Sequence, residues 1–288
     1  MKERVISGVI IAALIVGAGL LGGYPLAVLI MVCSMIGLQE LARATGVLES
    51  GQKVNALTGF AHGVTALFHV GLMVLWARWG ADPGGLVRTM DFYTIMIIVA
   101  AFIGIMTVYV LTFPKFRSEQ VMAAFFSFIY APVLMSFVYR ARMLPYGIFM
   151  YAMIFVCSSV CDTCALAAGM MFGKHKMEPV LSPKKTREGA AGGLLGSAVC
   201  SVILAYLVRF ADPEADLRIQ FLIIGICGAL ISMIGDLAAS AIKRNHEIKD
   251  YGSLIPGHGG IMDRFDSIIF TAPLIFILGA LLLGTAAL

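Results

Sequence analysis

Long apolar stretches alternate with short polar segments along almost the whole chain. A helix that crosses a bilayer needs about 20 mainly apolar residues, and the chain contains roughly nine such stretches. They are Val5–Leu21, Tyr24–Leu41, Ala56–Leu75, Tyr93–Phe113, Val121–Val138, Tyr146–Phe172, Ala191–Val208, Ile219–Ala239 and Ile268–Leu288. The pattern predicts an all-α polytopic membrane protein with about nine transmembrane helices.

The composition agrees with this pattern, because 60% of the residues are hydrophobic, 13% are charged and the mean hydropathy is +0.92. The first apolar stretch lacks the small-residue cleavage pattern of a signal peptide, so we expect a retained anchor. No charged linker and no repeat of fixed period divides the chain, which favours a single membrane domain over residues 1–288. Within it, we expect residues 1–145 to form a scaffold of helices with room for oligomer contacts. Residues 146–288 carry the helices and cytoplasmic loops with chemically suggestive side chains.

The distribution of basic residues indicates the orientation. With the N-terminus inside, about fifteen of the 21 Lys and Arg residues fall in cytoplasmic segments. The positive-inside rule therefore predicts a cytoplasmic N-terminus and, for nine spans, an external C-terminus. Both of the loops that are richest in polar residues then face the cytoplasm.

The loop after the sixth apolar stretch combines cations with turn-forming residues. Ser182, Lys184 and Lys185 place hydroxyl and ammonium donors close together, and the glycines between Gly189 and Gly193 allow a helix to begin near a ligand. Free backbone N–H groups at a helix N-terminus favour anions. Charge that only sets topology is the alternative. We favour the interpretation that this loop binds an anion.

Asp162 is an isolated acid within the sixth apolar stretch, about eleven residues or roughly 16 Å of helix before Gly173. A structural hydrogen bond is one explanation, but Asn or Ser would make it with less cost of desolvation. An ionisable residue inside a membrane is a functional-site hypothesis by default. Asp162 is therefore an additional candidate.

Further acids lie around the polar segment that precedes the ninth stretch. Asp236 and Lys243 share one helical face in the eighth stretch, together with Ser240. Asp263 and Asp266 share a face where the ninth helix is expected to begin. The helix macrodipole alone also favours acids at that position. With Asp236, however, they make an all-oxygen set that suits Mg²⁺ or Mn²⁺, with waters and substrate phosphates as further ligands.

The order of residues in this region resembles the signature of a known family. Ser240-x-x-Lys243-Arg244, then Lys249-Asp250, then Pro256-x-His258-Gly259-Gly260-x-x-Asp263-Arg264-x-Asp266 closely resembles that of the phosphatidate cytidylyltransferases, also called CDP-diacylglycerol synthases. Asp162-x-x-Ala165, and Phe172-Gly-Lys-His-Lys with Ser182-Pro-Lys-Lys-Thr-x-Glu188-Gly189, also look like this family. The resemblance covers the second half of the chain in detail and the first half in hydropathy alone.

Two positions depart from the family pattern. Leu166 stands where the family often has an aromatic residue, and Arg187 stands where it often has Trp. Neither departure removes a presumed ligand, although Arg187 would change contacts at the membrane surface.

The resemblance implies transfer of a cytidylyl group from CTP to phosphatidate, forming CDP-diacylglycerol and pyrophosphate for phospholipid biosynthesis, with Mg²⁺ or Mn²⁺ as cofactor. The expected catalytic residues are Asp236, Lys243, Asp263 and Asp266, and the expected metal ligands are Asp236, Asp263 and Asp266. The expected substrate-binding residues are Ser182, Lys184, Lys185, Ser240, Arg244, Lys249, Asp250, His258, Gly259, Gly260 and Arg264. The expected partners are CTP, phosphatidate and membrane lipids, with no nucleic acid and with a homodimer as one alternative.

Two other functions remain alternatives at this point. Acids within apolar helices also mark sites in transporters, here for an anionic solute or lipid, but such a site should lie nearer the middle of the membrane. A CTP-dependent lipid kinase would need a base to activate a hydroxyl group and would release CDP instead of pyrophosphate. The compact form of the chain favours the cytoplasmic membrane of a bacterium, with the active site facing the cytoplasm.

Overall fold

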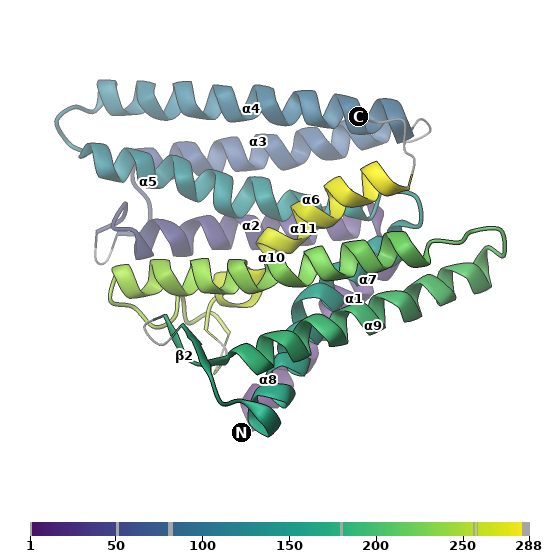
Figure 1. Cartoon of the computed structure of the whole chain (residues 1–288). Helices are drawn as coiled ribbons and strands as arrows, with labels where there is room; N and C mark the ends of the chain where they lie inside the picture. The colour runs from purple at the N-terminus through teal and green to yellow at the C-terminus, as the bar shows by residue number, and fades with distance from the viewer. Residues whose placement is uncertain are drawn as a thin grey trace. The chain divides into compact units, whose positions relative to one another are not determined.

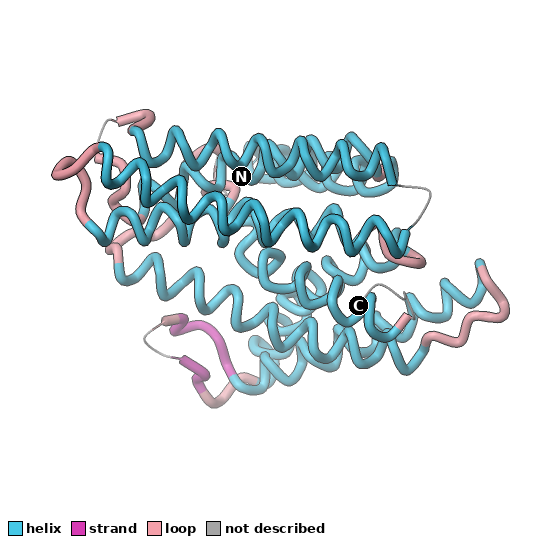
Figure 2. Tube along the Cα trace, turned by 90° about the horizontal axis from the view of Figure 1, so that it is seen from above, coloured by secondary structure: helices cyan, strands magenta, loops and turns pink. Residues whose placement is uncertain are grey.

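The computed structural model describes residues 2–49, 52–79, 83–178, 181–255, 257 and 259–283, and most of these residues are helical (Figures 1 and 2). The α-helices are α1 (Lys2–Leu21), α2 (Gly23–Ala44), α3 (Ala56–Trp79), α4 (Pro83–Leu111), α5 (Ser118–Phe128), α6 (Leu134–Ala141), α7 (Gly147–Phe155), α8 (Cys161–Phe172), α9 (Arg187–Ala211), α10 (Arg218–Asn245) and α11 (Met262–Leu282). Two π-helical turns, η1 (Ile129–Val133) and η2 (Val156–Val160), join α5 to α6 and α7 to α8. The strands β1 (Lys176–Glu178) and β2 (Ser182–Thr186) pair in antiparallel fashion.

The prediction of an all-α polytopic membrane protein is confirmed. Within the described residues, eight helical segments are long and apolar enough to cross a membrane, and they match the second to ninth predicted stretches. The first stretch falls on α1, whose described apolar part is the shorter segment Gly8–Leu21. The predicted and observed bounds differ most at the start of α4, at Pro83, and then equally at the end of α10, at Asn245, and the start of α11, at Met262. Hydropathy marks only the apolar part of a helix, whereas these helices continue into polar sequence.

Two of the spans contain a π-helical turn. In the first, Pro132 lies within η1, and proline has no backbone N–H with which to continue the regular hydrogen-bond ladder. In the second, η2 ends at Val160 and α8 carries Asp162 in its first turn. Irregular helical backbone therefore directly precedes the acid within the sixth span.

The contacts within the chain define two compact units. The first unit contains the chain up to Tyr139 together with His246–Arg264. The second contains Arg140–Asn245 and continues from Phe265 along α11. The division of roles at residue 145 stays a prediction. The polar segment before α11 packs in the first unit, although it follows α10 in sequence.

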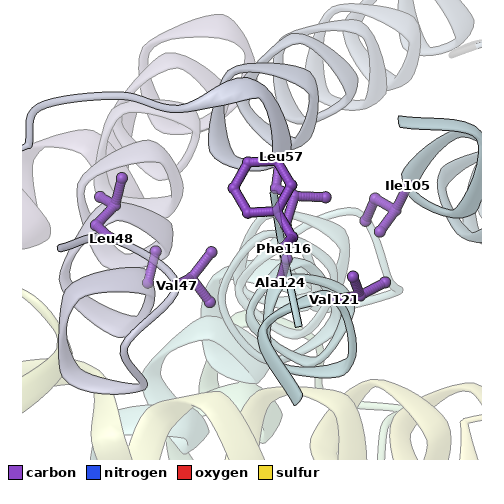
Figure 3. Packing of buried hydrophobic residues seen from close by; sticks show 8 residues of the cluster. Val47, Leu48, Leu57, Ile105, Phe116, Val121 and Ala124 are labelled. Atoms are coloured by element: carbon purple, nitrogen blue, oxygen red, sulfur yellow. The ribbon is translucent and has the colours of Figure 1, made fainter. Parts of the chain in front are cut away.

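A buried apolar cluster holds together the helix ends and loops of the first unit (Figure 3). Its members come from α2 to α5 and from the loops after α2 and before α5. They are Ala42, Val47, Leu48, Leu57, Ile105, Phe116, Val121 and Ala124. Leu57 is fully buried and Phe116 is 6% exposed. Close packing of these side chains fixes the loops to the helices that they join.

In the second unit, α9 packs closely against α8 and α10 through small residues. A Cβ atom at Gly192 would overlap the side chain of Ala168 on α8, and one at Gly196 would overlap Cys164. On the facing helix α10, a Cβ atom at Gly225 would overlap Ser201 of α9. Small residues let membrane helices approach each other closely. This packing sets the distance between α8 and α10, which both contribute acids to the site described next.

Candidate active site

A cavity of about 560 Å³ lies in the second unit where α8, the β1–β2 hairpin, α9 and α10 meet. Its polar lining consists of Asp162, Ser182, Lys184, Lys185, Thr186 and Asp236. The remaining lining consists of Ala165, Leu166, Gly169, Met170, Met177, Gly189, Ala190, Met233 and Leu237. The structure thus brings five residues singled out from the sequence, Asp162, Ser182, Lys184, Lys185 and Asp236, to one cavity. The mixed lining suits a ligand with both charged and apolar parts.

An ion pair between Lys185 of β2 and Asp236 of α10 is the central polar contact of this cavity. The side chains are 28% and 26% exposed, respectively. Asp162 of α8 interacts electrostatically with both of them. Two carboxylates in an apolar setting repel each other, and an ammonium group close to both offsets that repulsion. The charges therefore tie together three elements that lie far apart in sequence.

Asp266 of α11 extends this group of acids. It is partly buried and interacts electrostatically with Asp236, Lys243 and Asp162, while its Oδ1 accepts a hydrogen bond from the backbone N–H of Ser267 at 2.8 Å. Helices α10 and α11 approach closely beside Asp236, because a Cβ atom at Gly235 would lie 3.0 Å from the backbone oxygen of Asp266. We call Asp162, Asp236 and Asp266 the acidic cluster.

The acidic cluster is not a complete metal site by itself. Among the described residues, no three His, Cys, Asp or Glu side chains are arranged to hold a metal ion. Its oxygen atoms are nevertheless the ligand type that Mg²⁺ and Mn²⁺ prefer. Any such ion would need further ligands from a substrate or from water.

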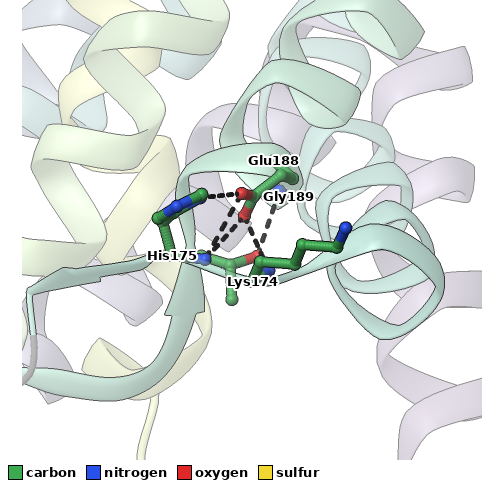
Figure 4. A network of polar contacts seen from close by, with 5 residues as sticks. Lys174, His175, Glu188 and Gly189 are labelled. Carbon is green, nitrogen blue, oxygen red and sulfur yellow. Dashed lines mark hydrogen bonds and ion pairs between the residues drawn. The ribbon is translucent and has the colours of Figure 1, made fainter.

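The hairpin that carries Lys185 is held at its base by Glu188 in the first turn of α9 (Figure 4). Glu188 Oε2 accepts hydrogen bonds from the backbone N–H groups of Lys174 at 3.1 Å and His175 at 3.2 Å. Its Oε1 lies 2.6 Å from the imidazole Nδ1 of His175. Thr186 caps the same helix, since its Oγ1 accepts the N–H of Gly189 at 3.1 Å. These contacts fix where β2 ends and α9 begins, and therefore where Lys185 lies.

Three further predicted residues lie on α10. Ser240 follows Asp236 by one helical turn and is partly buried, as is Lys243, whereas Arg244 is exposed. Lys243 acts electrostatically on Asp266. The predicted stripe of Asp236, Ser240 and Lys243 therefore begins at the cavity and continues along the helix toward the end that carries the cations.

The glycine-rich segment before α11 belongs to the first unit, and Asp263 holds it together. The Oδ2 of Asp263 accepts the N–H of Tyr251 at 2.8 Å and that of Gly260 at 3.0 Å. Gly259 has a φ of +84°, and a Cβ atom there would lie 2.8 Å from the same carboxylate oxygen. Glycine is thus required at this position on two counts.

Four other residues that the sequence predicted for the site belong to this region. Three of them are described in the structure and lie in the first unit. Lys249, Asp250 and Arg264 are exposed, and Asp263 is buried. His258 lies outside the described residues. The roles assigned to these side chains in binding and catalysis stay predictions.

One residue with a prominent place in the structure was not a candidate from the sequence. Glu40 of α2 is 5% exposed, and its carboxylate accepts hydrogen bonds from the backbone N–H groups of Ile261 at 3.0 Å and Met262 at 2.8 Å. The sequence did contain one sign of its importance, because Glu40 is an ionisable residue within the second apolar stretch. Its partners are backbone groups 221 and 222 positions away, which no motif reveals.

Comparisons with known proteins agree with the chemistry of these residues. The family model of the cytidylyltransferase family matches residues 2–282. A phosphatidate cytidylyltransferase of Bacillus subtilis (strain 168) is 30% identical over 284 residues, which cover 98% of each chain. One from Staphylococcus aureus (strain COL) is 30% identical over 279 residues, covering 96% of this chain and 98% of the relative. These matches define a membrane-embedded nucleotidyltransferase. The chain belongs to the cytidylyltransferase family.

Replacing Glu188 by Gln should loosen the base of the hairpin, because the amide cannot accept all the hydrogen bonds that the carboxylate accepts from Lys174 and His175. We expect backbone hydrogen exchange over residues 174–178 and 181–187 to rise by about tenfold, measured by mass spectrometry. Glu178→Gln, which changes an exposed acid of β1 in the same way, is the matched control and should leave exchange unchanged. Equal exchange rates in the two variants would contradict the assignment.

Proposed function

We propose that the cavity in the second unit is where this enzyme transfers the cytidylyl group of CTP to phosphatidate. The family relation makes CTP-dependent formation of CDP-diacylglycerol the reaction of the chain. The observation that carries the location is the Lys185–Asp236 ion pair with Asp162 beside it, in a cavity whose remaining lining is mainly apolar. Charged groups suit the phosphates of both substrates, and the apolar lining suits a diacyl lipid.

The reaction places little demand on proton transfer. An oxygen of the phosphatidate phosphate attacks the α-phosphorus of CTP and forms a new P–O bond. The bond between the α-phosphorus and the oxygen that bridges to the β-phosphate breaks, and pyrophosphate leaves with the electron pair. The phosphatidate phosphate is already anionic near neutral pH, so no strong general base is needed. Catalysis then depends on positioning and on neutralisation of charge.

Residues of the second unit have distinct proposed roles in this step. Lys184 and Lys185 neutralise phosphate charge, and Ser182 donates a hydrogen bond from the same strand. Lys243 acts from α10 near Asp266, with Ser240 and Arg244 on the same helix. The phosphatidate phosphate, the α-phosphate of CTP and the leaving pyrophosphate are all anionic in the transition state. Cations that are already fixed beside them lower the energy of that state without having to reorganise.

Residues of the first unit are proposed to bind substrate as well. The cations Lys249 and Arg264 would neutralise phosphate charge. Backbone N–H groups of the glycines around His258, other than that of Gly260, which donates to Asp263, would reach phosphate oxygens, because glycines allow close approach of the backbone. Asp250 and His258 are also proposed to bind substrate.

Mg²⁺ or Mn²⁺ is the proposed cofactor, and the residues present fit such an ion. Asp236 and Asp266 offer only oxygen donors and repel each other, so a cation would relieve that repulsion. Mg²⁺ is commonly held by one or two carboxylates together with substrate phosphates. The described residues agree with this mode of binding, because they include no group of three side chains arranged to hold a metal ion. When bound, the ion would supply neutralisation of the nucleotide phosphates and of the leaving pyrophosphate. Asp263 stays a predicted ligand, since its Oδ2 holds the adjacent backbone.

The membrane setting matches the lipid substrate. The chain is an integral membrane protein, and large apolar side chains on its spans are exposed, among them Leu111 at 79% and Phe210 at 90%. We propose that these faces contact membrane lipids and that the active site faces the cytoplasm of a bacterial cell, as the basic loops indicate.

The reaction itself is tested with CTP that carries a label on one phosphate. Purified protein in detergent with Mg²⁺, phosphatidate and CTP labelled on the α-phosphate should move label into the lipid fraction and release an equal amount of pyrophosphate. CTP labelled on the γ-phosphate is the matched control, and its label should leave in pyrophosphate. Lipid labelled from the γ-phosphate would instead identify a lipid kinase. Absence of turnover by folded protein would also contradict the proposal.

The role of Asp236 is tested by Asp236→Asn. The substitution removes the anionic charge that pairs with Lys185, and we expect kcat to fall by about 100-fold or more at every Mg²⁺ concentration. Asp216→Asn changes an acid in the loop before α10 that pairs with Arg218, and it should leave kcat unchanged. A steady-state titration with Mg²⁺ compares the two variants. If Asp236→Asn keeps kcat within about twofold of wild type, Asp236 does not have this role.

A further inference from the structure

Glu40 brings a carboxylate from α2 to the start of α11 within the first unit. Its two oxygens accept separate hydrogen bonds, Oε1 from the N–H of Ile261 and Oε2 from the N–H of Met262. Met262 is the first residue of α11. The side chain is buried, and the charged groups that act on it are Arg43 and Asp263.

The chemistry of a helix start explains why a carboxylate suits this position. The first N–H groups of a helix have no partner within the helix, and the helix dipole makes that end partly positive. Hydrogen bonds to an ionised acceptor are shorter and stronger than bonds between neutral groups. Usually such a cap is the residue just before the helix. Here it comes from α2, so the cap also fixes the start of α11 and the preceding segment to that helix.

The segment before α11 is shaped around the Glu40 carboxylate. A Cβ atom added at Gly252 or at Gly260 would overlap Glu40 Oε1, so any larger residue would take the space of the Glu40 side chain. One turn earlier on α2, a Cβ atom at Gly37 would lie 2.8 Å from the sulfur of Met262. One face of α2 is therefore complementary to residues on both sides of the glycine-rich segment.

Two carboxylates hold the same segment from different directions. Asp263 accepts the N–H groups of Tyr251 and Gly260, and Glu40 accepts those of Ile261 and Met262. Gly260 thus donates to one carboxylate and packs against the other. The hydrogen bonds fix the backbone N–H groups of residues 260–262 and the side chain of Asp263. Gly260 and Asp263, two of the predicted site residues, lie in this stretch.

We propose that Glu40 is a positioning residue for cytidylyl transfer. Its carboxylate fixes the conformation of residues 259–263 and so sets the direction in which Asp263 and Arg264 are presented. Glu40 contacts backbone and does not itself touch substrate. The effect on activity rests on the proposed function, whereas the effect on the conformation of the segment can be measured without it.

The first test is Glu40→Gln, which keeps the size of the side chain. One of the two acceptor oxygens becomes an NH₂ group that faces a backbone N–H, so at least one of the two hydrogen bonds is lost. We expect kcat to fall by about tenfold or more while KM for CTP stays within about twofold. Hydrogen exchange over residues 259–263 should rise by about tenfold, with no change in the helices of the second unit.

The matched control is Glu49→Gln. Glu49 is an exposed acid that follows α2 in the same unit, and its carboxylate accepts a hydrogen bond from the side chain of the nearby Gln52, so this change should leave kcat and exchange at wild-type values. A Glu40→Gln variant with kcat within about twofold of wild type would overturn the proposal. So would a loss of activity that accompanies faster exchange throughout the chain, because that result indicates general loss of structure.

A second test uses the contact with Gly252 and does not depend on the folding of Glu40→Gln. Gly252→Ala adds a methyl group that meets the Glu40 carboxylate, so we expect it to lower kcat by about tenfold in the otherwise wild-type chain. In a Glu40→Ala chain the methyl group has room, and Gly252→Ala should then have little further effect. Effects that multiply in the double variant would contradict contact between the two positions. If wild-type protein fails to transfer the cytidylyl group, the proposed function fails, and the exchange data alone then decide the role of Glu40.

Discussion

Charged side chains within an apolar helical protein must be paired, and the pairing of Lys185 with Asp236 organises the second unit. The lysine comes from β2, its partner from α10, and the neighbouring Asp162 from α8. An unpaired acid at either helical position would carry a large cost of desolvation. The hairpin must therefore stay close to both helices. Glu188 holds the hairpin base, and the glycines of α9 allow α8 and α10 to be near enough for one ammonium group to serve both acids.

In the first unit, backbone N–H groups donate hydrogen bonds to the buried acids. Glu40 and Asp263 each accept two of them, and all four belong to the segment that ends in α11. A carboxylate that accepts two backbone N–H groups restricts the conformation of the backbone that donates them. The two units therefore use acids in different ways. In the second unit an acid faces a cavity and stays available for chemistry, whereas in the first unit acids shape the glycine-rich segment.

Much of this architecture could be predicted from residue patterns, because a membrane imposes a simple rule on the spans. Apolar length predicted the helices, and acids within apolar stretches singled out Asp162 and Asp236. The hairpin was not predicted, since Pro183 and adjacent lysines break the alternation typical of strands. Glu40 was missed because its partners are backbone groups more than two hundred positions away, and these carry no side-chain signal. Sequence also could not show that Lys185, rather than Lys184, pairs with Asp236.

The central claim is that Lys185 and Asp236 act as one unit, and a double-mutant cycle tests it most directly. Lys185→Met, Asp236→Asn and the double variant would be compared with wild type in kcat/KM for CTP, with thermal unfolding of each purified protein as the check on folding. The account predicts strong coupling, of about 1–3 kcal/mol, so that the double variant is little worse than the more damaging single change. Losses that simply multiply, from three folded variants, would show that the two residues act independently and would contradict the account.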